Sequence, residues 1–208
     1  RDLASEQSSA DVMTINGTAN KTMFLLALAM GSACFTWSKT FSGLETNPAT
    51  AIPWATGGAV VGLIAGLVIC FKHTWAPMLA PVYALAEGLF IGGVSASFEA
   101  RYPGIVIQTV GGTFGTLFGL LLAYQSGLIK ATENYKLSVV AATGGIFLVH
   151  VISLIGSFFG FPIPYIHESG PLGIGFSLLV VVIAALNLVL DFDFIEQAAD
   201  RGAPKYLE

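Results

Sequence analysis

Six long apolar runs constrain the fold of this chain most. An α-helix needs roughly 20 apolar residues to cross the hydrocarbon of a bilayer. The runs that are long enough are Thr22–Phe41, Ala51–Phe71, Pro77–Phe98, Ile105–Ile129, Ser138–Phe161 and Leu172–Ile195. Strands of a membrane barrel would be shorter and would alternate polar with apolar residues, whereas these runs are apolar on all sides. With 54% hydrophobic and 11% charged residues, the chain is predicted to be an all-α, polytopic transmembrane bundle of about six helices.

The charged residues divide the chain into one membrane domain and two polar ends. We predict a polar N-terminal tail over residues 1–21, a transmembrane helical domain over 22–197 and a cytoplasmic C-terminal segment over 198–208. Lysine and arginine favour the cytoplasmic side of a membrane protein. Most of those near the apolar runs fall on the side of the N-terminus, namely Lys21, Lys72, Lys130, Lys136, Arg201 and Lys205. The N-terminus and the Lys130–Lys136 loop are therefore predicted to be cytoplasmic, and the Pro162–Gly170 loop to be outside.

Two of the apolar runs carry a glycine at every fourth position. Such a stripe lies on one face of a helix and lets another helix approach closely, which is how helices attract one another in lipid. We therefore expect helix-packing seams along two stripes, one of Gly58, Gly62 and Gly66, and one of Gly111, Gly115 and Gly119.

Three ionisable side chains lie inside the predicted helices, where each charge costs about 2.5–3.5 kcal/mol even on lenient insertion scales. Glu87 and His150 lie near the middle of the third and fifth runs, and Asp191 lies about one turn from the cytoplasmic end of the sixth. At similar depth, Glu87 and His150 can share a proton or hold an ion. Each also has a simpler interpretation as a hydrogen-bonded residue of the helix bundle.

Two aspartates in the last run are candidates for the carboxylate that faces the interior of the helix bundle. Asp191 and Asp193 are two residues apart, roughly 200° around a helix, so they cannot both face the bundle axis. Asn187 lies four residues before Asp191 and shares its face, which favours Asp191 as the interior carboxylate. Asp193 leans towards the emerging tail, where a solvated interfacial position is the simpler interpretation.

Four segments carry a family resemblance: Tyr83–Gly93, Phe98–Gly104, His167–Phe176 and Leu188–Gln197. Together they resemble a bacterial branch of the Bax inhibitor-1 family, the transmembrane Bax inhibitor motif proteins. The resemblance runs from about Lys21 to the last residue. It implies a seven-helix fold with the last helix surrounded by the others, and a pH-sensitive calcium leak gated by two carboxylates that share protons, on helices six and seven. Asp191 matches the helix-six carboxylate best, with Asp193 the alternative.

The chain departs from the family pattern in two places. The best-understood members have a basic residue in the second span that pairs with the carboxylates, and Ala51–Phe71 contains none. The sequence also stops at Glu208, where a similar protein would begin its seventh helix. We expect that helix and the second carboxylate to lie beyond Glu208.

These observations predict an integral protein of a bacterial inner (cell) membrane that passes calcium or protons down their gradient. Asp191 would be the gate, Asn187 its polar neighbour and Glu87 a second acid on the path, with Asp193 and His150 as further candidates. Asp191 and Glu87 would make transient calcium contacts, because calcium prefers oxygen ligands. Calcium, or alternatively the proton, is expected as the transported ion, and no cofactor and no nucleic-acid partner are expected.

The alternative function is a non-transporting interaction or regulatory subunit that packs against partner membrane proteins. An enzyme is not predicted, because no His/Glu metal cluster or nucleophile–base pair occurs at helical spacing.

Overall fold

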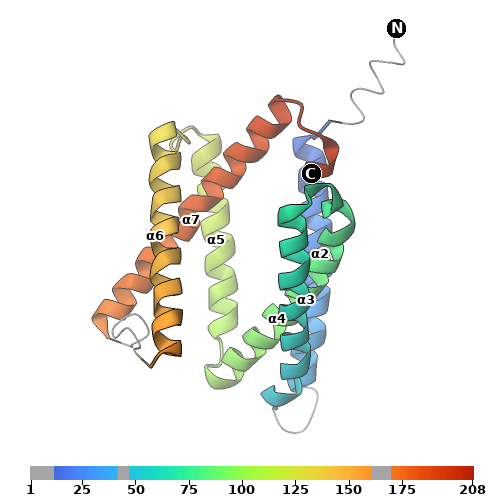
Figure 1. The fold of residues 1–208 in the computed structure, drawn as a ribbon, viewed down its shortest axis with the longest axis vertical. Helices are drawn as coiled ribbons and strands as arrows, with labels where there is room; N and C mark the ends of the chain where they lie inside the picture. Colours follow the sequence, from blue (N-terminus) through green and yellow to red (C-terminus); the bar gives the residue numbers. More distant parts are fainter. Residues whose placement is uncertain (1–11, 42–46, 161–169) are drawn as a thin grey trace. The chain divides into compact units, whose positions relative to one another are not determined.

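The computed structural model describes residues 12–41, 47–160 and 170–208 (Figure 1). Most of these residues form six long helices: α2 (Ile15–Phe41), α3 (Ile52–Phe71), α4 (Ala76–Arg101), α5 (Ile105–Gln125), α6 (Glu133–Phe158) and α7 (Pro171–Asp200). Three single turns of 3-10 helix connect or follow them: η1 (Pro48–Thr50), η2 (His73–Trp75) and η3 (Lys205–Leu207). The predicted all-α fold is confirmed. Nearly all of the predicted Pro162–Gly170 loop lies outside the described residues, as does the first part of the His167–Phe176 segment.

Five of the helices, α3 to α7, are long and apolar enough to cross a membrane. They coincide with five of the six apolar runs. Helix α2 has 27 residues, but its apolar stretch is bounded by Lys21 and Lys39 and is interrupted by serine and threonine, so it is less hydrophobic than the others. The composition and lengths of these helices support an integral, multi-pass membrane protein.

The helix ends are set by local capping groups rather than by the limits of the apolar runs. Helix α2 begins earlier than its run because the Thr14 hydroxyl accepts a hydrogen bond from the Gly17 N–H at 2.9 Å, so the last part of the predicted tail is helical. Helix α6 also begins early, because the Thr132 hydroxyl accepts from the Tyr135 N–H at 3.3 Å. Helix α5 ends sooner than expected, and Gly127 follows it with a left-handed φ of 72°.

The described chain forms two compact units. Unit 1 contains the described residues up to Gly111 together with Ile195–Glu208, and unit 2 contains Gly112–Phe194. In unit 1, helix α4 packs against both α2 and α3 (Figure 1). The most deeply buried side chains of this unit are small, at 1% exposure or less: Thr36, Thr40, Ala51 and Ala96.

Glycines bring the helices of unit 1 into backbone contact. A Cβ added to Gly58 of α3 would lie 2.5 Å from the Ala86 carbonyl oxygen of α4, and one added to Gly62 would lie 3.4 Å from a Glu87 carboxylate oxygen. The predicted seam in the second span is therefore confirmed. The second seam stays a prediction, because within unit 2 a Cβ added to Gly115 meets no atom within 4 Å.

Candidate functional site

An ion pair joins the two helices of unit 2 that carry most of the predicted site residues. The Lys136 Nζ of α6 lies 2.8 Å from Asp193 Oδ2 of α7, and the two side chains are only 26% and 18% exposed. Glu133 lies 3.5 Å from the same ammonium group but is 92% exposed, so it is the weaker partner. Whereas Asp193 was expected to be solvated, most of its side chain is enclosed, because the early start of α6 places Lys136 on the helix opposite it.

Two further hydrogen bonds connect α6 and α7. The Asn187 side-chain amide donates to the Thr143 hydroxyl at 2.9 Å. The Tyr135 hydroxyl donates to the Leu186 carbonyl at 2.9 Å. Polar bonds of this kind hold membrane helices together because lipid offers no competing partner. Asn187 is therefore one of the groups that tie α7 to α6.

Asp191 lies on a different side of α7 from Asp193. Within the described part of the chain it is exposed and makes no hydrogen bond or ion pair. Its carboxylate oxygens are thus available to a proton or a cation, while those of Asp193 face Lys136. The two aspartates diverge as their spacing predicts, but Asp191, which was predicted to be the interior carboxylate, is the exposed one, and Asp193 is the enclosed one. Their roles in ion passage stay predictions.

His150 lies on α6, and its Nδ1 is 2.9 Å from the Ile146 carbonyl oxygen of the same helix. Its ring centroid lies 5.9 Å from that of Phe176 on α7. In the sequence, Lys136, Thr143 and His150 lie seven residues apart. All three side chains contact α7. Lys136 and Thr143 were not predicted as site residues, although this spacing, which places residues on one helix face, could have indicated them.

Glu87 lies in unit 1, midway along α4. It borders a groove of about 350 Å³ between α3 and α4, which is also lined by Tyr83, Gly62 and Gly66. The two glycines leave the carboxylate room for a small occupant on the α3 side. Because Glu87 belongs to unit 1 and His150 to unit 2, the predicted proton sharing between them stays a prediction.

Glu99 has a structural role in the Phe98–Gly104 segment. Its carboxylate oxygens accept hydrogen bonds from the backbone N–H groups of Gly104, at 2.6 Å, and Val106, at 3.1 Å. Glu99 thereby connects the end of α4 to the start of α5, where a carboxylate is favoured by the unpaired N–H groups. No sequence periodicity marks this role.

The family model described as Bax inhibitor 1 like matches residues 1–208. No curated protein and no solved structure gave a match. The resemblance noted in the sequence is confirmed at the level of the family, and the bacterial branch stays a prediction. With multi-pass apolar helices and a family match over its full length, the chain belongs to the Bax inhibitor 1 like family.

Proposed function

We propose that this protein passes calcium ions or protons down their gradient across a membrane and that protonation of Asp191 gates the passage. The supporting observation is the different environment of the two aspartates of α7. Asp193 is paired with Lys136 at 2.8 Å, so its charge is balanced within the protein. Asp191 makes no such contact in the described chain, and an ionisable group of this kind in an apolar helix is favoured where water, ions or protons reach it.

Calcium fits either carboxylate chemically because it takes hard oxygen ligands. Asp191 would contact a passing ion within unit 2, and Glu87 would make a separate contact within unit 1, next to open space in the α3–α4 groove. Family membership adds support, because the resemblance implies a pH-sensitive calcium leak.

The test is ion flux through the purified full-length protein in liposomes that contain a calcium-sensitive dye. We expect calcium entry to exceed that of protein-free liposomes and to change between pH 6 and pH 8. Proton flux is measured in parallel with a pH-sensitive dye. Absence of both fluxes from protein that remains folded and monodisperse would contradict the proposal. It would favour the interaction subunit, whose docking face would include the glycine stripe of α5, where Gly115 is uncovered within unit 2.

We further propose that the protein lies in a bacterial inner membrane with its N-terminus in the cytoplasm. Single cysteines at Ala49 and Ala131 test this orientation once Cys34 and Cys70 have been replaced. With an impermeant maleimide, Ala49→Cys should label in intact spheroplasts and Ala131→Cys only after permeabilisation, because Ala131 belongs to the basic loop. The opposite labelling pattern would reverse the topology.

A further inference from the structure

The segment after α7 turns back onto the start of α2, in unit 1. The Met13 N–H donates to the Ala203 carbonyl at 2.7 Å, and Val12 forms an antiparallel bridge with Pro204. Residues 203–208 therefore run beside the first turn of α2 instead of leaving the unit.

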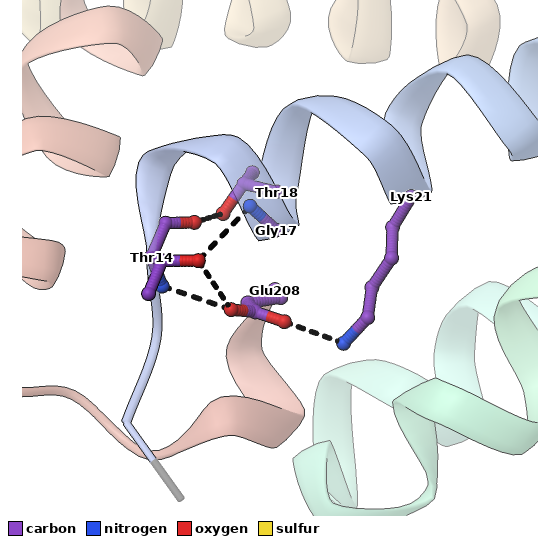
Figure 2. A network of polar contacts seen from close by, with 5 residues as sticks. All are labelled: Thr14, Gly17, Thr18, Lys21 and Glu208. Atoms are coloured by element: carbon purple, nitrogen blue, oxygen red, sulfur yellow. Dashed lines mark hydrogen bonds and ion pairs between the residues drawn. The ribbon is translucent and has the colours of Figure 1, made fainter. Parts of the chain in front are cut away.

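A buried carboxylate completes this attachment (Figure 2). Glu208 accepts hydrogen bonds from the Thr14 N–H, at 2.8 Å, and the Thr14 hydroxyl, at 3.1 Å, and its other oxygen lies 2.8 Å from Lys21 Nζ. The Glu208 side chain is 2% exposed and that of Lys21 is 46% exposed. Gly17 leaves the space that the carboxylate occupies, because an added Cβ would lie 2.6 Å from Glu208 Cδ.

The same segment lines one side of a cavity of about 390 Å³. Tyr206 of η3 lies on one wall, and Phe24 of α2 and Pro77 of α4 lie on apolar walls contributed by the other elements. Lys21 and His73 also line this cavity, so its surface combines apolar side chains with basic groups.

We propose that residues 203–208 form a strap along one wall of this cavity and that the Glu208 carboxylate is its latch. Three donor contacts converge on this one side chain, so its release removes most of the polar attachment at this end of the strap. Opening of the strap removes the wall that Tyr206 and Leu207 contribute and frees the Lys21 ammonium. Opening and closing thus change the surface that this end of unit 1 presents.

The latch is sensitive to acid. The hydrogen bond from Lys21, together with those from Thr14, lowers the pKa of Glu208 below its ordinary value of 4.5, and burial opposes this only in part. The contribution of the latch to stability is therefore fully present above pH 4.5 and is lost as the pH falls through the lowered pKa. Lys21, His73 and Tyr206 are the titratable groups that face the cavity with Glu208. Tm should fall less with acid in Glu208→Gln than in the unchanged protein.

Cysteine accessibility tests the strap directly. In full-length protein lacking Cys34 and Cys70, Ala80→Cys places a thiol on the cavity wall, and a water-soluble maleimide reports opening at pH 7. We expect Glu208→Gln and Gly17→Ala each to increase the labelling rate about threefold or more, because bonds to a charged group are lost and the strap then shields Ala80, which is half-buried when the strap is closed, for less of the time. Two controls should leave the rate unchanged. Asp200→Asn removes an exposed carboxylate of α7, and Gly31→Ala adds a methyl group where nothing lies within 4 Å.

A thiol in the core separates strap opening from general unfolding. Thr36 is 0% exposed in unit 1, so Thr36→Cys should stay unlabelled while Ala80→Cys reacts faster. Equal Ala80→Cys rates with and without the Glu208 carboxylate would overturn the latch. Parallel acceleration at Thr36→Cys would also overturn it, because the carboxylate would then stabilise the whole unit. Neither outcome depends on ion flux.

Discussion

Gly88→Ala should destabilise unit 1 strongly, whereas Gly31→Ala should have little effect. A Cβ added to Gly88 of α4 would overlap the Ala29 carbonyl oxygen and the Ser32 hydroxyl of α2, and would lie 2.8 Å from the Ala29 carbonyl carbon. Overpacking usually costs about 1–3 kcal/mol. Since two of these neighbouring atoms belong to backbone that cannot rotate away, we expect a cost of about 3 kcal/mol or more. The two helices would have to separate.

The measurement is the thermal unfolding of both variants in the same detergent, followed by size-exclusion chromatography. Gly31 is the matched control because it lies on α2 in the same unit, and an added Cβ there meets no atom within 4 Å. Alanine at this position should be neutral or slightly stabilising. Equal Tm values for the two variants would mean that α2 and α4 do not approach through Gly88.

Asp191→Asn should flatten the pH response of ion flux, whereas Asp193→Asn should leave that response nearly intact. Asparagine keeps the shape of the side chain but cannot gain or lose a proton between pH 5 and pH 8. Asp191 makes no ion pair within the described residues, so its protonation can change with the pH of the solution or when an ion passes. Asp193 faces Lys136 at 2.8 Å, and its replacement should instead lower the stability of the α6–α7 contact by about 1–3 kcal/mol.

Flux in liposomes is measured from pH 5 to pH 8 for full-length protein, alongside Tm for each variant. Asp200→Asn is the control for loss of one carboxylate from α7, because Asp200 lies exposed at the end of the helix. A flattened response in Asp193→Asn with an unchanged response in Asp191→Asn would transfer the gate to Asp193. An unchanged response in both variants would remove carboxylate gating by this helix.

The helices themselves could be predicted because the signal is local. Each apolar run is long enough to span the membrane, and five of the runs coincide with the membrane-length helices α3 to α7. Glycine at every fourth residue likewise identified the face of α3 that packs on α4. The ends of the helices were predicted less accurately, because a single threonine hydroxyl, such as that of Thr132, extends a helix beyond its apolar run.

The partners of the polar side chains required the folded chain. Each of these helices carries apolar residues on every face, so no amphipathic pattern indicates which face meets which neighbour. Lys136 was predicted only as a positively charged loop residue, yet it lies on α6 and forms an ion pair with Asp193 on α7. Glu208 and Thr14 are separated by 194 residues in the sequence, and no local pattern relates them. Propensity and hydropathy act over a few turns of chain, whereas these contacts depend on how distant helices pack.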